Sequence, residues 1–288
     1  MKNACFLKIG LILLLPVFLS AQHDVPDTLR PVLRLAVQAR YAEADQLSNV
    51  YLISVQNTVE KYDSSGRLLT RYSNNRLGRA ERLDASNPLK ILVWYPDFQT
   101  LVWLDRNLTE LGILSLSEAG FGMPSAIAAA SDGNLWLYDE SQFRLLKVSP
   151  EGKILVESQD FNLLFPKITR VVAIKESPAE ITAAGAQGNE VFLMTEREGI
   201  QRFNIFGAYI GLWQPHNATL LDFSPALKLL LFEGGRMEQT RSGGFEKETP
   251  GYVLPHLPGD QYFLHAGGIS LLRKKQVQVF KTASNMRE

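Results

Sequence analysis

Cysteine is almost absent from this sequence. Among 288 residues the single cysteine is Cys5, which precedes an apolar N-terminal segment. It does not stand at the cleavage point of that segment, where a lipid-anchored protein would need it. The rest of the chain therefore has no disulfide, no thiolate nucleophile and no cysteine ligand for zinc.

A net charge of either sign is also lacking. The 30 Lys and Arg residues balance the 30 Asp and Glu residues, so the formal net charge is zero. No basic field of the kind that attracts nucleic acid exists, and we expect no nucleic-acid partner. With 45% hydrophobic and 21% charged residues, the composition is that of an ordinary globular protein with a full core.

The residues and motifs of common catalytic and metal sites are few. The four histidines, His23, His216, His256 and His265, are not at metal-ligand spacing. There is no G-x-S-x-G motif, and the Gly120-Phe121-Gly122 segment does not join a strand to a helix, so no phosphate-binding loop is predicted.

Carboxylates without a motif do not by themselves predict a calcium site in a channel. The residues considered for such a site are Asp132, Glu180 and Asp222. Asp132 precedes Gly133 and is better explained as a turn residue. We expect no cofactor and no metal, and we favour a protein that is not an enzyme.

A long apolar run occurs at the N-terminus. Lys2 and Lys8 precede the apolar residues 9–19, and Ser20-Ala21-Gln22 follows them. This pattern predicts a signal peptide, residues 1–21, and the run is shorter than the roughly 20 residues of a membrane-spanning helix. An uncleaved anchor is the alternative. We expect export to the periplasm or outer membrane of a Gram-negative-type bacterium, or to the medium, with no transmembrane segment after cleavage.

Short apolar runs separated by turns repeat through the rest of the chain. Residues 131–155 show the unit most completely, as three short strand patterns joined by polar turns. The second strand of each copy is expected to start near residues 50, 91, 135, 191, 229 and 269. A period of about 40 residues with four short strands predicts a β-propeller. The longer interval, residues 160–189, predicts an extended loop or an extra hairpin.

We therefore predict that residues 22–288 form a single all-β domain, a six-bladed β-propeller of four-stranded antiparallel blades. Residues 28–41 are expected to supply a strand to the blade that begins near Gln261, so that the N-terminal strand closes the ring and removes open sheet edges. Large side chains in the strands are expected to pack between blades; these are Tyr51, Tyr62, Trp94, Trp103, Trp136, Tyr138 and Phe143.

One blade resembles the NHL-type repeat, which has a strand, then an Asp-x-x-Asn-x-Arg step, then a strand and a turn glycine. Asp139, Gln142 and Arg144 match that step with glutamine in place of asparagine, and Gly152 matches its turn glycine. The resemblance, to NHL-like and TolB-like six-bladed propellers, covers the architecture of about residues 25–284. It implies the fold, and since such propellers include lyases, lactonases and scaffolds, it selects no activity.

The breaks between second and third strands are expected to lie on one face of the disc. Loops on a propeller rim are held by a rigid scaffold and commonly bind partners, although turns are also polar simply because they are solvated. Acids in blades two to four and bases in blade six predict a charge gradient across this face. The residues expected to contact a partner are Asp97, Gln99, Asp139, Glu140, Gln142, Glu196, Arg197, Arg236, Lys274 and Lys275.

Three functions stay open at this stage. The leading one is a non-catalytic scaffold or accessory subunit that binds another envelope or outer-membrane protein through this face. The second is a module that binds a small ligand, glycan or peptide in the central funnel. The third is a metal-dependent lactonase or lyase. A deep polar channel would favour the second, and a channel plugged by apolar residues would exclude the second and the third.

Overall fold

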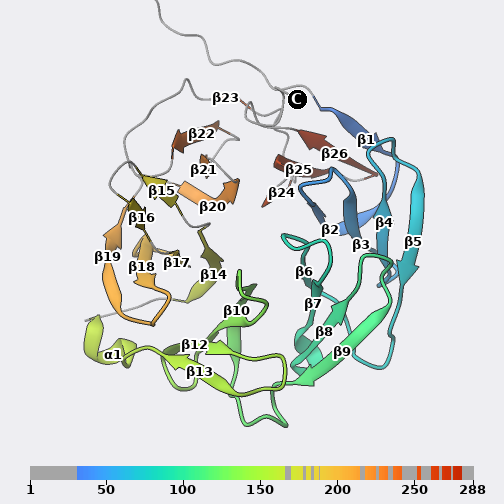
Figure 1. Cartoon of the computed structure of the whole chain (residues 1–288). Helices are drawn as coiled ribbons and strands as arrows, with labels where there is room; N and C mark the ends of the chain where they lie inside the picture. Colours follow the sequence, from blue (N-terminus) through green and yellow to red (C-terminus); the bar gives the residue numbers. More distant parts are fainter. Residues whose placement is uncertain are drawn as a thin grey trace, which may run out of the picture.

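The computed structural model describes most of the chain after residue 30. The described residues are 31–165, 170–177, 180–182, 185–187, 189–214, 218–224, 227–232, 236–241, 252–253, 261–265, 268–273 and 275–280. Their strands form six four-stranded antiparallel sheets and one two-stranded hairpin. The four-stranded sheets stand around a ring, each with one strand near the centre and one at the outside (Figure 1).

The first three sheets follow the chain directly, and we call them blades 1 to 3. Blade 1 contains β2 (Ala39–Ala44), β3 (Val50–Ser54), β4 (Val59–Tyr62) and β5 (Leu68–Tyr72). Blade 2 contains β6 (Arg82–Asp84), β7 (Ile91–Tyr95), β8 (Thr100–Leu104) and β9 (Glu110–Ser115), with the short 3-10 helix η1 (Pro96–Phe98) between β7 and β8. Blade 3 contains β10 (Pro124–Ala129), β11 (Leu135–Asp139), β12 (Arg144–Val148) and β13 (Ile154–Glu157).

The next three sheets are called blades 4 to 6. Blade 4 contains β14 (Val171–Glu176), β17 (Glu190–Thr195), β18 (Ile200–Asn204) and β19 (Tyr209–Trp213). Blade 5 contains β20 (Ala218–Ser224), β21 (Leu227–Phe232), β22 (Arg236–Arg241) and β23 (Tyr252–Val253). Blade 6 contains β24 (Gln261–His265), β25 (Gly268–Arg273), β26 (Gln276–Phe280) and, from the start of the chain, β1 (Leu33–Leu35).

The prediction of an all-β propeller with four-stranded antiparallel blades is confirmed. The observed second strands begin at Val50, Ile91, Leu135, Glu190, Leu227 and Gly268, within two residues of the expected positions. The long interval contains the single-turn helix α1 (Phe161–Leu164) and the extra hairpin β15 (Glu180–Thr182) and β16 (Gly185–Gln187). Within the described residues, no helix is long and apolar enough to cross a membrane.

The first described strand belongs to the last blade. β1 pairs antiparallel with β26, with Leu33 opposite Val279 and Leu35 opposite Val277. Leu35 is buried in a cluster that also contains Ala42 and Val50 of blade 1. The strand expected within residues 28–41 therefore lies in the blade that begins at Gln261, and its side chain reaches across to blade 1.

Apolar side chains fill the spaces between neighbouring blades. One cluster joins blades 1 and 2, another joins blades 2 and 3, and a third joins blades 3 and 4. Trp136 and Tyr51 are fully buried there, as expected for large side chains of the second strands. Because the second strands of blades 1 to 4 are buried between neighbouring sheets, their sequences are almost continuously apolar.

The turns between third and fourth strands share one construction. Asp63 accepts hydrogen bonds from the N–H groups two and four residues later, and so does Asp105. Ser149 and Asn204 occupy the same place in blades 3 and 4 and accept the equivalent bonds. The residue three positions on has positive φ in each turn; these residues are Gly66, Leu108, Gly152 and Gly207.

Candidate functional site

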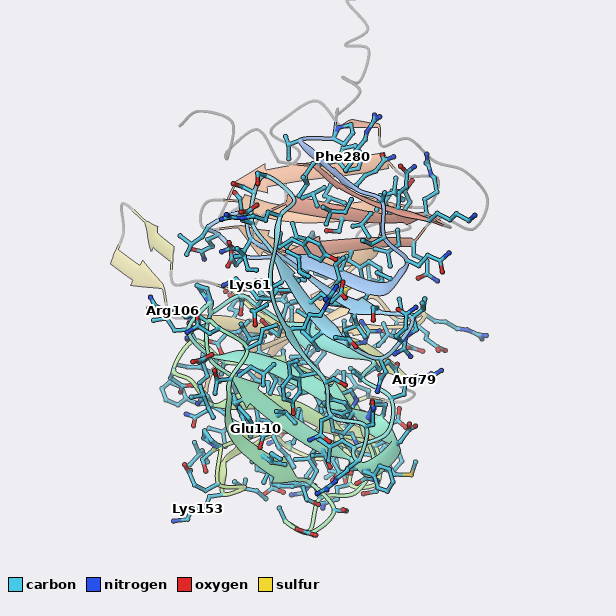
Figure 2. All side chains as sticks on the ribbon, turned by 90° about the vertical axis from the view of Figure 1, so that its right-hand side faces the viewer. Lys61, Arg79, Arg106, Glu110, Lys153 and Phe280 are labelled. Carbon is cyan, nitrogen blue, oxygen red and sulfur yellow. The ribbon has the colours of Figure 1, made fainter. Side chains whose placement is uncertain are left out.

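The ring has two different faces. Since each strand reverses the direction of the one before, the hairpins between second and third strands lie on the same side as the connections from one blade to the next. We call this side the hairpin face and the opposite side the turn face. Figure 2 shows the ring from its edge, with Arg79 of the connection from blade 1 to blade 2 on one side and Arg106 and Lys153 of the turns on the other.

The predicted rim residues lie at the hairpins of this face. Asp97 and Gln99 are in the hairpin of blade 2, Asp139, Glu140 and Gln142 are at that of blade 3, and Glu196 and Arg197 are in that of blade 4. Lys275 is exposed between β25 and β26. Arg236 begins β22, and its side chain, like the whole of Lys274, lies outside the described residues.

Asp139 is fully buried and positions the backbone around it. Its Oδ2 accepts a hydrogen bond from the N–H of Gly122 at 2.9 Å. Its Oδ1 accepts bonds from the N–H and Oγ of Ser141 and from the N–H of Gln142. The carboxylate therefore ties the hairpin of blade 3 to the connection that arrives from blade 2, and it has no exposed oxygen to offer a partner.

Asp97 and Asn57 make the equivalent link one blade earlier. Asp97 Oδ2 accepts a hydrogen bond from the N–H of Arg79 at 2.8 Å, while Asn57 accepts from the N–H of Ala80 and donates to the carbonyl of Gly78. A Cβ on Gly78 would lie 2.6 Å from Cβ of Asp97, so the connection can pass this close only as glycine. These hairpins are polar partly because Asp97, Asn57 and Asp139 bind the backbone of the connections between blades.

Gln99 is half-buried. It adopts a left-handed conformation with φ of 48°, and its buried Oε1 has no hydrogen-bond partner in the described part of the chain. Gln142, Glu196 and Arg197 are exposed, and Glu140 is half-buried. Together with Asp97 and Lys275, which are also exposed, these four side chains are open to a partner.

Exposed apolar side chains on the hairpin face were missed by the sequence analysis. Phe98 is 59% exposed, Met123 67%, Phe143 40% and Leu163 84%. The packing role predicted for Phe143 is wrong, because its positive φ of 53° ends the hairpin with the ring turned outward. In the sequence, Phe143 looked like the first residue of a buried strand, and β12 in fact begins at Arg144.

These apolar side chains come from neighbouring segments. The N–H of Glu140 donates to the carbonyl of Met123, and the N–H of Phe161 donates to the carbonyl of Phe143. The hairpin of blade 2 is joined to the same region, since the N–H of Leu116 donates to the carbonyl of Gln99. We call residues 96–99, 116–123, 140–143 and 158–165 the acidic-apolar sector.

The charge of this sector has one sign. Its segments contain Asp97, Glu118, Glu140 and Asp160 as acids and include no lysine or arginine. Exposed basic side chains of the hairpin face include Arg79, whose backbone N–H donates to Asp97 of the sector, and Arg76, Arg197 and Lys275 outside it. The gradient predicted across this face, from acids in blades 2 to 4 to bases in blade 6, stays a prediction, because most loop residues of blades 5 and 6 lie outside the described residues.

A pocket of about 270 Å³ lies at the centre of the ring, between the first strands of blades 1 to 4. Charged residues from two first strands line it: Glu81, Arg82 and Asp84 at β6, and Arg170 and Lys175 at β14. Trp94 and Ile127 add apolar surface. The centre of the ring is thus open and lined by polar groups at this place. It is not filled by the apolar side chains that would have excluded a bound ligand.

Asp84 is already engaged in linking blades. Its Oδ2 accepts a hydrogen bond from the N–H of Ala129 in blade 3, and its Oδ1 accepts one from the N–H of Ser86. Glu43 does the same one blade earlier, because its Oε1 accepts from the N–H of Ala85. Acids near the ends of the first strands therefore bind the backbone of the next blade.

No group of three or more His, Cys, Asp or Glu residues suited to a metal ion occurs among the described residues. Asp132 is a turn residue, as expected: it accepts from the N–H of Asn134 and pairs with Lys147 Nζ at 2.6 Å. Burial opposes its ionisation, but the hydrogen bonds from Lys147 and Asn134 prevail and lower its pKa. The side chains of Glu180, Asp222 and the four histidines lie outside the described residues.

Comparisons with known proteins show the fold and nothing finer. No protein-family model matches the sequence, and no curated protein matches it significantly. The crystal structure of BBS1N in complex with ARL6DN is similar over 90% of this chain and 87% of that one, with a TM-score of 0.52 and 10% identity. A catalytically inactive virginiamycin B lyase from Staphylococcus aureus with quinupristin is similar over 85% and 84%, with a TM-score of 0.52 and 12% identity.

Proposed function

We propose that this protein is an exported, non-catalytic β-propeller that binds another protein of the cell envelope through the acidic-apolar sector. The observation that carries the proposal is the group of large apolar side chains left exposed on that sector, Phe98, Met123, Phe143 and Leu163. Exposed apolar residues gathered on one face and surrounded by polar groups are characteristic of protein-binding surfaces.

The rigidity of the sector also suits a docking role. The hairpins of blades 2 and 3 are fixed to the incoming connections by Asp97 and Asp139, whose carboxylates bind backbone N–H groups. Exposed side chains on such a frame lose little conformational freedom when a partner binds, which favours affinity.

The charge of the sector defines the partner's chemistry. An acidic surface without lysine or arginine favours a partner with basic residues around an apolar anchor. The attraction between exposed charges weakens as salt concentration rises, because the Debye length falls to about 8 Å at physiological ionic strength. A neighbour of similar fold, BBS1N, has been crystallised in a protein complex, which is compatible with such a role.

The location in the envelope rests on the N-terminal sequence. Lys2 and Lys8 followed by an apolar run and by Ser20-Ala21-Gln22 form the pattern of an export signal. The N-terminus of the purified mature protein, determined by mass spectrometry after expression in a Gram-negative host, is expected to be Gln22. A periplasmic fraction without this protein would contradict the export part of the proposal.

The binding part is tested by affinity purification of the tagged protein from native envelopes. The test variant is Phe98→Ser with Phe143→Ser, and the matched control is Phe206→Ser, since Phe206 is 76% exposed on the turn face. We expect a partner that is captured by the wild type and by the control variant, is lost with the double variant, and dissociates at high salt.

Folding of each variant is checked by thermal unfolding, and all three are expected to unfold at similar temperatures because the replaced side chains are exposed. Capture of the same proteins by the double variant and by the wild type would overturn the proposal. So would a partner lost equally with Phe206→Ser.

A further inference from the structure

A second site, separate from the rim, is suggested by the central pocket. We infer that this pocket binds a small organic anion, in which a carboxylate or phosphate group is attached to an apolar body. The pocket lies between the first strands of blades 1 to 4, whereas the acidic-apolar sector lies on the hairpins and connections outside them. The inference therefore does not depend on the proposed docking function.

The donors for an anion are two arginines. Arg82 at the start of β6 and Arg170 just before β14 both line the pocket and are exposed to solvent within it. Neither guanidinium has a hydrogen bond or ion pair with another side chain of the described residues. Guanidinium groups present a planar set of N–H donors that match the oxygens of a carboxylate or phosphate.

Ser125 adds a third polar group. Its Oγ is buried against the pocket and has no hydrogen-bond partner among the described residues. The register of β10 against β11 shifts at this residue, between Pro124 and Ala126, which marks a β-bulge. Bulges commonly re-aim a side chain next to a functional site, and a buried hydroxyl without a partner is uncommon in native proteins.

The balance of charge in the pocket is positive. Of the two lining acids, Asp84 has both oxygens bound to backbone N–H groups of Ser86 and Ala129. Glu81 is exposed and is the remaining carboxylate near the arginines. Lys175 contributes another positive charge to the same lining. An anion therefore meets more positive than negative charge at this place.

The apolar side chains that line the pocket indicate that the ligand has an apolar part. Trp94, Ile127 and Val172 are half-buried and line the pocket beside these polar groups. The volume of about 270 Å³ lies just below the usual range of about 300–1,000 Å³ for ligand pockets. A single aromatic ring with one anionic group is a ligand of suitable size.

The test is isothermal titration of the full mature chain with phenyl phosphate, 3-phenylpropanoate, inorganic phosphate and benzyl alcohol. We expect at least one of the two aromatic anions to bind more tightly than inorganic phosphate and than neutral benzyl alcohol. The tighter of the two identifies the anionic group. If benzyl alcohol binds as tightly as both anions, or if no probe binds at millimolar concentration, the inference is wrong.

Charge variants locate the binding. Arg82→Gln and Arg170→Gln are each expected to weaken the better probe about tenfold or more, because each removes a charged hydrogen bond. Glu81→Gln is expected to strengthen it, since it removes a repelling charge. The matched control is Arg106→Gln, whose side chain is exposed on the turn face and which should leave the affinity unchanged.

These variants replace exposed side chains, and equal thermal unfolding temperatures should show that they fold. An unchanged affinity in both arginine variants, or a weaker affinity in Glu81→Gln, would place binding elsewhere and overturn the inference. Failure of this site leaves partner capture through Phe98 and Phe143 unaffected, so the two proposals are judged separately.

Discussion

Asp139 and Gly122 are 17 positions apart and are joined by a hydrogen bond of 2.9 Å from the backbone N–H of Gly122 to the carboxylate of Asp139. A Cβ on Gly122 would lie 1.8 Å from Oγ of Ser141 and 2.7 Å from Oδ1 of Asp139. The acid and the glycine therefore fit together as a pair, which fixes the position of the hairpin of blade 3. Asp139, predicted as a binding residue of the rim, therefore has a structural role.

Replacement of Asp139 should be costly. Asp139→Ala leaves the N–H groups of Gly122, Ser141 and Gln142 without their acceptor in a buried site. We expect the free energy of unfolding to fall by about 2 to 3 kcal/mol, as for the loss of hydrogen bonds to a charged group. Urea unfolding followed by circular dichroism measures it. Glu140→Ala is the control and should change stability by less than about 0.5 kcal/mol. Equal effects of the two variants would contradict the structural role of Asp139.

Gly152 should resist substitution because of its backbone conformation. Its φ is +85°, and a Cβ would lie 3.1 Å from Cβ of Ala119 and from Cδ1 of Leu114. Gly152→Ala is expected to destabilise the protein by about 1 to 2 kcal/mol, the usual cost of a left-handed alanine. Gly112→Ala is the control, since Gly112 has no positive φ and no atom within 4 Å of its Cβ position. If Gly152→Ala is as stable as Gly112→Ala, the turn does not need a glycine.

The acids of the turns should make stability depend on pH. Hydrogen bonds from Ser65 and Arg67 lower the pKa of Asp63 to about 2, and the backbone N–H groups of Thr109 and Asn107 lower that of Asp105. A pKa that is lower in the folded state gives stability that is present above the unfolded value, about 3.9 for Asp, and is lost as pH falls through the folded value. Stability should therefore decrease between about pH 4 and pH 2.

Replacing the aspartate of these turns by asparagine removes the group that titrates but keeps an oxygen that can accept the hydrogen bonds. Asn204 makes the equivalent bonds in blade 4 to the N–H groups of Phe206 and Ala208. Asp63→Asn is thus expected to keep the turn at neutral pH and to reduce the loss of stability in acid, as measured by urea unfolding at pH 7, 4 and 3. A loss in acid as steep as in the wild type would show that other groups control it.

The strand β1 should stabilise the junction between the two ends of the chain. Leu35 is 5% exposed and packs against blade 1, while Val32, just before the strand, is 53% exposed. Leu35→Ala is expected to cost about 2 to 5 kcal/mol, as for other buried leucines. Val32→Ala should cost less than about 0.5 kcal/mol. Similar unfolding midpoints for the two variants would mean that the pairing of β1 with β26 contributes little to holding the ring together.

Much of the fold could be predicted because patterns over a few neighbouring residues determine the strands and turns. The turn of Asp132-Gly133-Asn134 and the apolar run after it appear in the structure as a hairpin with Asp132 bound to the N–H of Asn134. The positive φ of Gly152 follows from its place in a four-residue turn. Even the position of β1 followed from a closed-ring argument, because an open sheet edge next to β26 would be unfavourable.

The candidate sites were less predictable because their properties depend on distant segments. Phe143 resembled a buried strand residue, and only the hairpin geometry turns it to solvent. Met123 and Leu163 lie in connections between strands, where no alternation of apolar and polar residues predicts which side chains are exposed. The central pocket brings together Arg82 and Arg170, 88 positions apart in the sequence, through the placement of two first strands.

The sequence by itself determined the strands, their turns and the repeat that arranges them in a ring, because apolar alternation and turn residues act over a few positions. It also determined that acids gather in the hairpins of blades 2 and 3. Only the tertiary structure decided which of these acids remain available. Asp139 accepts a hydrogen bond from the backbone of an incoming connection and is buried, whereas the side chain of the next residue, Glu140, stays half-exposed.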